Sequence, residues 1–215
     1  MPVYGLDERI IFPKSELAEE DGLLAVGGDL SLERLVLAYE NGIFPWYNEE
    51  DPILWWCPKE RYIIRPENIK ISKSMKRLLN KHDFEVSYDK NFEAVISNCK
   101  EIRENAEGTW ITNDIKEAYI NLFNNGLAGS VEVTQNGELV GGIYGVKLGK
   151  CFFGESMFSK IPSGSKIALI YLAKKLKEEG FVFIDCQFHT PHLESMGGEY
   201  ISWEEYRGYL DKYSK

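Results

Sequence analysis

The sequence predicts an α+β fold with a small N-terminal domain, residues 1–60, and a larger C-terminal domain, residues 61–215. Two observations predict this division. The first 60 residues are rich in aromatic side chains and interrupted by proline, whereas helical and strand-like segments follow one another from residue 61 onward. A third observation concerns the sheet: the segments 128–135, 138–148 and 151–158 are separated by very short turns, which only antiparallel neighbours allow.

The N-terminal domain is expected to hold one helix and otherwise irregular chain. Ser31 is a typical N-cap residue and Gly42 a typical residue at the end of a helix, so the helix should lie between them. Gly27 and Gly28 indicate a turn before it. Because so short a segment buries little surface alone, we expect it to pack against the C-terminal domain.

Five further helices are predicted in the C-terminal domain, with Asp89, Thr112 and Ser202 as N-caps for three of them. Ser202 and Glu205 form a capping-box pattern, and Gly126 and Gly180 mark helix ends. The expected helices are 73–81, 90–104, 113–125, 165–179 and 203–212.

Five strands are expected, at 84–88, 128–135, 138–148, 151–158 and 181–187. Asn136-Gly137 is a strong signal for a two-residue hairpin turn, and Gly149-Lys150 indicates a second turn. The result is a mostly antiparallel sheet flanked by helices. An antiparallel meander followed by a long helix and a further strand is the order typical of an acetyltransferase-like (GNAT-type) domain.

The composition favours a globular protein, with 44% hydrophobic and 27% charged residues among 215. No stretch approaches the ~20 apolar residues that span a bilayer, and the first residues lack a signal peptide's basic and apolar regions, so we expect a cytoplasmic protein without a membrane partner. The four cysteines lie far apart and are expected to be reduced thiols.

Charge is unevenly distributed along the chain. The net charge is -9, yet residues 59–81 hold eight basic and only two acidic residues. Such a cluster can bind phosphates even in an acidic protein. The alternative is that Lys73, Lys76, Arg77 and Lys81 form only the solvated face of a helix, and charge alone does not decide between the two.

Three segments partly resemble common catalytic motifs but do not match them. Gly154-Glu155-Ser156-Met157-Phe158 lacks the second glycine of the serine-hydrolase turn. Cys186, His189 and His192 lack a clear fourth ligand, so no metal site is expected. Ser163-Gly164-Ser165-Lys166 does not match the phosphate-binding loop of nucleotide hydrolases.

Polar residues at the end of a buried strand are more informative. Alternation along 181–187 would place Asp185 and Gln187 on one face and Cys186 on the other. A buried carboxylate and amide need partners or a ligand, and an internally satisfied pair is the structural alternative. Glu155, between apolar segments, raises the same question.

These residues belong to a series of motifs that runs in order from about Phe12 to Ser202, and through them the chain resembles the bacterial leucyl/phenylalanyl-tRNA protein transferase family. The matching strings are Asp21–Leu30 (DGLLAVGGDL), Gly42–Tyr47 (GIFPWY), Pro52–Trp56 (PILWW), Thr109–Thr112 (TWIT), Leu139–Val146 (LVGGIYGV), Phe153–Phe158 (FGESMF) and Asp185–Gln187 (DCQ).

The resemblance implies an enzyme that moves leucine or phenylalanine, and less readily methionine, from aminoacyl-tRNA to the N-terminal α-amine of proteins beginning with Arg or Lys. The product would be marked for degradation by the N-end rule. The family's architecture, a small N-terminal domain joined to an acetyltransferase-like domain, agrees with the boundary near residue 60. No cofactor is implied, and a monomer is expected.

The resemblance also implies roles for individual residues. Asp185 and Gln187 fall on the catalytic pair and Glu155 on a polar residue of the reaction centre. The basic region that meets the acceptor stem corresponds to Lys73, Lys76 and Arg77. Substrate-binding positions around the terminal adenosine and the side-chain pocket correspond to Tyr39, Trp46, Trp110, Tyr119, Ile143, Phe152, Leu169, Leu172 and Leu176.

The chain departs from the family pattern at several positions. An arginine that is familiar near Ser72-Lys73-Ser74 is lysine here, and this change removes a fork-shaped phosphate donor. Thr134 replaces a frequent tryptophan, and Gly164-Ser165-Lys166 replaces the usual Ala-Ser-Lys. The run 188–192 also varies, which leaves a role for Thr190 undecided.

Two rival functions stay open at this point. An acyl-CoA-dependent N-acetyltransferase could use the same scaffold, although residues 160–165 fit a pyrophosphate loop poorly. A noncatalytic RNA-binding adaptor could use the basic segment. For the transferase, an aminoacyl ester is already activated, so the enzyme mainly aligns ester and amine. Gln187 would accept a hydrogen bond from the amine, and Asp185 would either polarise or orient that amide. The sequence does not decide whether Gln187, Asp185 or the 2′-hydroxyl of the tRNA moves the proton.

Overall fold

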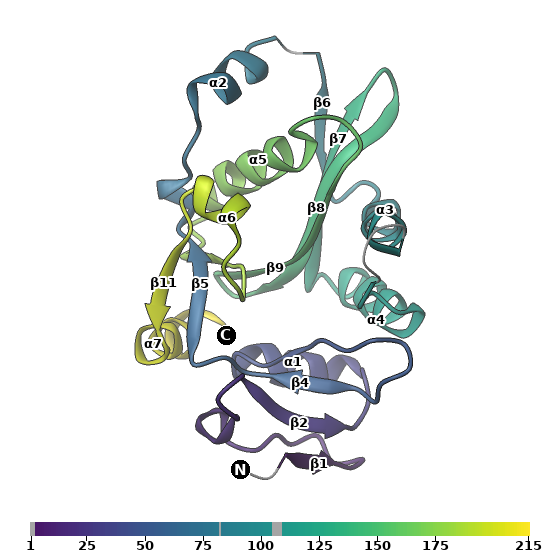
Figure 1. Cartoon of the computed structure of the whole chain (residues 1–215), viewed down its shortest axis with the longest axis vertical. Helices are drawn as coiled ribbons and strands as arrows, with labels where there is room; N and C mark the ends of the chain where they lie inside the picture. Colours follow the sequence, from purple (N-terminus) through teal and green to yellow (C-terminus); the bar gives the residue numbers. More distant parts are fainter. Residues whose placement is uncertain (1–2, 82, 105–108) are drawn as a thin grey trace.

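The computed structural model describes residues 3–81, 83–104 and 109–215, and its strands form two separate sheets (Figure 1). The small sheet has the order β1-β2-β4-β3, with β1 parallel to β2 and the other pairs antiparallel. Its strands are β1 (Tyr4–Leu6), β2 (Leu23–Gly27), β3 (Phe44–Pro45) and β4 (Leu54–Trp56). The expectation of irregular chain around the first helix was therefore wrong. These strands are two to five residues long and pair with residues 10 to 33 positions away, so no local alternation reveals them.

The large sheet has the order β11-β5-β10-β9-β8-β7-β6, and only the β9–β10 pair is parallel. The α+β prediction with a mostly antiparallel sheet is confirmed. The strands are β5 (Glu60–Ile64), β6 (Glu85–Tyr88), β7 (Ala128–Gln135), β8 (Glu138–Leu148), β9 (Cys151–Ser159), β10 (Phe183–Asp185) and β11 (Glu199–Ser202). Asn136 and Gly137, both with positive φ, form the predicted hairpin turn. Strands β5 and β11 were not predicted.

The six predicted helices are present, together with a short unpredicted one, α6. Their bounds are α1 (Leu32–Glu40), α2 (Lys73–Leu79), α3 (Phe92–Glu104), α4 (Asn113–Asn124), α5 (Gly164–Glu178), α6 (Pro191–Ser195) and α7 (Trp203–Tyr213). The side chains of Ser31, Thr112 and Ser202 cap α1, α4 and α7 as expected. Asp89 does not cap α3; it has positive φ, and its carboxylate accepts from the Ser130 amide at 2.7 Å and contacts Lys147.

Alternating side chains give the large sheet two apolar faces. Tyr144 and Phe153 point to the face covered by α3 and α4, whereas Ile143 and Phe152 point to the face covered by α5 (Figure 1). The core on the first face continues into the N-terminal part, where α1 lies between the small sheet and α4. One continuous core thus holds the N-terminal elements against the large sheet.

The strands β9 and β10 separate at the centre of the large sheet. Their last paired residues are Phe153 and Asp185; β10 ends there, whereas β9 continues to Ser159. Strand β9 also carries a bulge, because Tyr144 pairs with Ser156 but Gly145 pairs with Gly154, which leaves Glu155 as the extra residue. A bulge re-aims side chains, and this one lies where the two strands part.

Within the described part of the chain, no helix is long and apolar enough to cross a membrane.

Candidate active site

A cavity of about 550 Å³ lies where β9 and β10 separate, within the size range of small-molecule sites. Strand β3 and Trp110, which lies just before α4, close one side, and α5 and α6 close the other. Apolar side chains make up most of its wall, with a few polar groups among them. The lining residues are Phe44, Pro45, Trp46, Arg103, Trp110, Ile143, Gly154, Glu155, Ser156, Met157, Ser165, Leu169, Ile184, Cys186, Gln187, Phe188, Thr190, His192 and Leu193.

Glu155 reaches the cavity from the bulge in β9. Its Oε1 lies 2.7 Å from the Tyr39 hydroxyl oxygen, and its Oε2 lies 3.2 Å from the Tyr119 hydroxyl oxygen. The two hydroxyls also form a hydrogen bond with each other, and because each has one proton, all three hydrogen bonds form only when the carboxyl is protonated. Burial raises the pKa of Glu155 to about 8, against the two tyrosine hydrogen bonds, which lower it. The carboxyl is therefore mainly protonated at pH 7 and adds little negative charge to the cavity.

Gln187 presents a carboxamide to the cavity from a turn just after β10. Its φ of +57° is in the left-handed region, which turns the chain out of the strand, and its backbone N–H donates to Asp185 Oδ1 at 2.8 Å. In the orientation that its surroundings favour, the side-chain nitrogen donates to the carbonyl oxygens of Cys186 at 3.0 Å and Gly154 at 3.1 Å. Oε1 is then the atom left to accept a hydrogen bond from a ligand.

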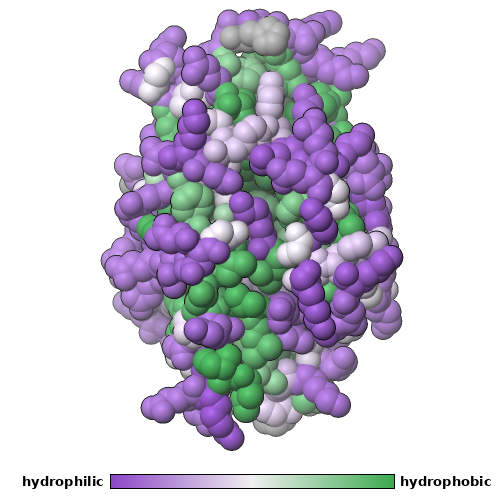
Figure 2. Space-filling model, turned by 180° about the vertical axis from the view of Figure 1, so that it is seen from behind, coloured by the Kyte–Doolittle hydropathy of each residue, from purple (hydrophilic) through white to green (hydrophobic). Residues whose placement is uncertain are grey.

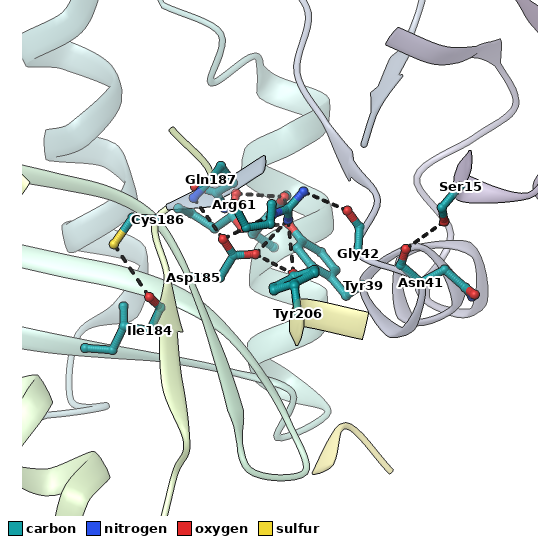
Figure 3. A network of polar contacts seen from close by, with 12 residues as sticks. Ser15, Tyr39, Asn41, Gly42, Arg61, Ile184, Asp185, Cys186, Gln187 and Tyr206 are labelled. Atoms are coloured by element: carbon teal, nitrogen blue, oxygen red, sulfur yellow. Dashed lines mark hydrogen bonds and ion pairs between the residues drawn. The ribbon is translucent and has the colours of Figure 1, made fainter. Parts of the chain in front are cut away.

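The Asp185 carboxylate is fully buried and does not line the cavity. Oδ2 is 2.6 Å from Arg61 Nη2 and accepts from the Tyr206 hydroxyl, also at 2.6 Å (Figure 3). The prediction that Asp185 and Gln187 share a face differs from the structure. Cys186 points away from the Asp185 carboxylate and lines the cavity, as alternation predicts. The strand ends at Asp185, however, and the left-handed turn brings Gln187 to the cavity as well, on the side of Cys186.

Arg61, which the sequence reasoning did not identify, joins this site to the N-terminal part. It is 1% exposed, donates to the Gly42 carbonyl at 2.9 Å, and lies over the rings of Phe44 and Tyr206 (Figure 3). Burial is the largest single influence and lowers its pKa, but the Asp185 carboxylate, Tyr206 and Cys57 together raise the pKa above the ordinary value. A charged residue opening the apolar run Arg61–Ile64 was the signal that could have found it.

The structure brings together some of the predicted site residues and separates others. Six of them line the cavity: Trp46, Trp110, Ile143, Glu155, Leu169 and Gln187. Tyr39 and Tyr119 lie behind Glu155 and reach the cavity through it. The remaining pocket candidates, Phe152, Leu172 and Leu176, lie instead along a second cavity of about 120 Å³ farther along α5.

The basic residues Lys73, Lys76 and Arg77 are all exposed on α2, while Met75 of the same helix packs into the core. None of the three lines the 550 Å³ cavity. They form an outlying cationic surface at the end of the molecule farthest from the small sheet (Figure 1).

Other lining residues were not among the predicted site residues. Met157, Ile184 and Cys186 contribute apolar wall, and Phe188 is 40% exposed at the rim, where its ring lies 5.8 Å from that of Trp46. Thr190 lines the cavity and caps α6 by accepting from the Leu193 N–H.

The described residues contain no cluster of three or more metal-ligating side chains. His189 bonds to Glu194 Oε2 at 3.1 Å, and burial raises the pKa of the Cys186 thiol, which disfavours a reactive thiolate.

Comparisons with known proteins agree with the motif pattern. The family profile described as leucyl/phenylalanyl-tRNA protein transferase matches residues 63–211, and the profile for that family's N-terminal domain matches residues 28–59. A leucyl/phenylalanyl-tRNA–protein transferase of Flavobacterium johnsoniae is 52% identical over 97% of this chain and 99% of its own. The protein of that name from Syntrophobacter fumaroxidans is 53% identical over 94% of this chain and 87% of its own.

Solved structures with similar folds are more distant. A GCN5-related N-acetyltransferase from Kribbella flavida has 8% identity and a TM-score of 0.41, and the match covers 75% of this chain and 57% of that one. A predicted acetyltransferase with acetyl-CoA from Clostridium acetobutylicum has 15% identity and a TM-score of 0.38, with 51% and 82% covered.

Proposed function

The chain belongs to the leucyl/phenylalanyl-tRNA protein transferase family, so it is an aminoacyltransferase that moves an amino acid from aminoacyl-tRNA to protein, and we propose the finer assignment as follows. It transfers leucine or phenylalanine, and less readily methionine, to the N-terminal α-amine of proteins that begin with Arg or Lys. The product carries a degradation signal of the N-end rule. The chain acts as a monomer in the cytoplasm and needs no cofactor.

The observation that carries the proposal is the cavity at the parted strands, with its apolar wall and the Gln187 amide on that wall. Ile143, Leu169 and Ile184 supply an apolar surface suited to a leucyl or phenylalanyl side chain. Such a pocket rejects charged side chains strongly but separates residues of similar size by only ~1–3 kcal/mol. Acceptance of more than one apolar amino acid follows from that.

The chemistry requires alignment more than activation. The neutral α-amine attacks the ester carbonyl carbon, the C–N bond forms, the C–O bond to the terminal ribose breaks, and the amine's proton passes to the departing ribose oxygen. An α-amine has an ordinary pKa of about 7.7–8.0, so roughly a tenth is neutral at pH 7. Gln187 Oε1 accepts a hydrogen bond from this amine and holds its lone pair toward the ester, because the amide nitrogen is already committed to two backbone carbonyls.

Asp185 acts through Gln187 and does not touch the substrate. Its carboxylate is enclosed by Arg61 and Tyr206, and Oδ1 holds the Gln187 backbone N–H at 2.8 Å. It therefore fixes the left-handed turn that presents the amide. We assign Asp185 as a positioning residue and Gln187 as the group that meets the amine.

The overall charge of the chain favours a cationic acceptor, and Glu155 does not hinder the reaction of its amine. A carboxyl with a pKa of about 8 can hydrogen-bond to the substrate without opposing loss of the amine's proton at pH 7. The net charge of -9 favours approach of a chain that begins with Arg or Lys.

Acyl-CoA is a poorer fit for this site. Binding of a pyrophosphate would use free N–H groups at the start of α5. The Ser165 N–H already donates to Ser159 Oγ at 2.7 Å. Gly164 also packs closely against Gly141, because a Cβ added at Gly141 would lie only 2.7 Å from the Gly164 carbonyl carbon. The start of this helix is therefore committed to packing.

The assay offers an Arg-initiated peptide together with labelled Leu-tRNA or, separately, acetyl-CoA. Transfer of leucine with release of tRNA is the expected result, and a peptide that begins with alanine should accept far less. Transfer from acetyl-CoA alone would refute the proposal, and binding of tRNA without any transfer would favour an RNA-binding adaptor.

A further inference from the structure

The cavity wall contains very little permanent charge. Among the described lining residues, the side chains that can carry charge are Arg103, Glu155, Cys186 and His192. Burial raises the pKa of Glu155 to about 8 and that of the Cys186 thiol well above its ordinary value, and burial lowers the pKa of His192, so all three are mainly neutral at pH 7. Among the described lining residues, Arg103 is then the one that keeps a fixed charge.

Arg103 lies at the mouth of the cavity, near the end of α3. It is exposed and lines the cavity, so its guanidinium is reached both from solvent and from inside. Its Nε donates to Ser156 Oγ at 3.1 Å, and Ser156 adjoins Glu155 on β9 and is itself only 5% exposed. The tether holds one edge of the guanidinium, and no hydrogen bond or ion pair to another described residue occupies the Nη1 and Nη2 edge. None of the ion pairs between described residues involves Arg103.

We propose that Arg103 binds the phosphate on the 5′ side of the terminal aminoacylated nucleotide, an inference that rests on the proposed function. Of the two substrates, the acceptor arrives with a cationic first residue, which a guanidinium repels. The aminoacyl-adenosine end carries a phosphodiester anion, which a guanidinium binds with two parallel hydrogen bonds. The three cations of α2 do not line the cavity, so they cannot replace this contact.

The contact would fix the register of the nucleotide relative to the ester. A phosphate held at the mouth leaves the ribose and its ester to extend inward toward Gln187, and the amino-acid side chain to enter the apolar part of the same cavity. Ser156, which holds the Arg103 guanidinium, directly follows the bulged residue Glu155 on β9. The same short stretch of strand therefore positions both side chains. Arg103 is thus a specificity residue for a phosphorylated nucleoside over a free nucleoside.

The test measures direct binding of two non-hydrolysable analogues, the 3′-leucylamido derivatives of adenosine and of adenosine 5′-monophosphate. The unchanged protein should bind the phosphorylated analogue roughly tenfold or more tightly. Arg103→Gln should abolish this difference and leave the affinity for the unphosphorylated analogue unaltered, and Arg103→Lys should restore part of it. Lys73→Ala with Arg77→Ala is the control, since it should leave the phosphate preference intact.

Two results would overturn the inference. Arg103→Gln could retain the full phosphate preference, or it could weaken both analogues equally, which would assign Arg103 a structural role through Ser156. A protein that transfers leucine from Leu-tRNA but binds both analogues alike defeats this inference alone. A protein that neither transfers leucine nor binds either analogue defeats the proposed function together with it.

Discussion

Removal of the Tyr206 hydroxyl is a direct test of the buried network behind the cavity. That hydroxyl donates to Asp185 Oδ2 at 2.6 Å and lies 3.1 Å from Arg61 Nη2, with all three side chains buried. In Tyr206→Phe the carboxylate keeps Arg61 and the Gln187 N–H but loses its third donor. We expect a less stable protein whose Gln187 turn is held less firmly.

The size of the effect follows from the kind of bond that is lost. A hydrogen bond to a buried charged group contributes about 1.5–3 kcal/mol. For a chain of this length, each kcal/mol corresponds to about 2–4 °C, so Tm should fall by roughly 3–12 °C. The single-turnover rate of leucine transfer should also fall, but less than in Gln187→Ala, because Oδ1 still holds the turn.

Thermal unfolding and single-turnover transfer measure the two effects, and Tyr144→Phe is a matched control. Tyr144 is also fully buried, but its hydroxyl has no hydrogen-bond partner among the described residues. Its removal should therefore be neutral or stabilising. Equal losses of Tm in the two variants would refute the reasoning, since the loss would then reflect packing and not the bond to Asp185.

Three further perturbations test other parts of the site. Because the fold raises the pKa of Glu155 from 4.5 to about 8, the free energy of unfolding of the wild type falls as pH rises through that interval. In urea unfolding, Glu155→Gln should therefore gain stability relative to the wild type between pH 5 and 8, with no further gain above pH 8. Lys73→Ala with Arg77→Ala should weaken tRNA binding and lower the slope of log affinity against log salt by about 1.4–1.8, whereas an unchanged slope would make this surface a solvated helix face. Leu169→Ala should enlarge the apolar pocket and shift the ratio of kcat/KM values toward phenylalanine over leucine by ~1–3 kcal/mol. An unaltered ratio would show that Leu169 does not contact the side chain of the transferred amino acid.

Local signals in the sequence determined the helices and the meander well. The caps Ser31, Thr112 and Ser202 and the Asn136-Gly137 turn depend on neighbours within a few residues, and all are present. Pairings that join distant segments could not be predicted in the same way. The four strands of the small sheet, and β5 and β11 of the large one, are stabilised by partners far along the chain, and none has enough length for a periodic pattern.

The site shows the same division. Alternation correctly assigned a polar strand end at Asp185, but the left-handed turn at Gln187 and the bulge at Glu155 are backbone features that alternation does not contain. Arg61 could not be paired with Asp185 from sequence, because 124 positions separate them. Arg103 likewise meets the cavity only because α3 packs across β8 and β9.

The most direct test of the account compares Gln187→Ala with the unchanged protein in two measurements, the single-turnover rate of leucine transfer to an Arg-initiated peptide and the dissociation constant for Leu-tRNA. The account predicts a rate lower by roughly 10²-fold, because the amine loses its alignment, with a dissociation constant changed less than about threefold. A loss of tRNA affinity as large as the loss of rate would contradict it, since the Gln187 amide would then bind the tRNA and not the attacking amine.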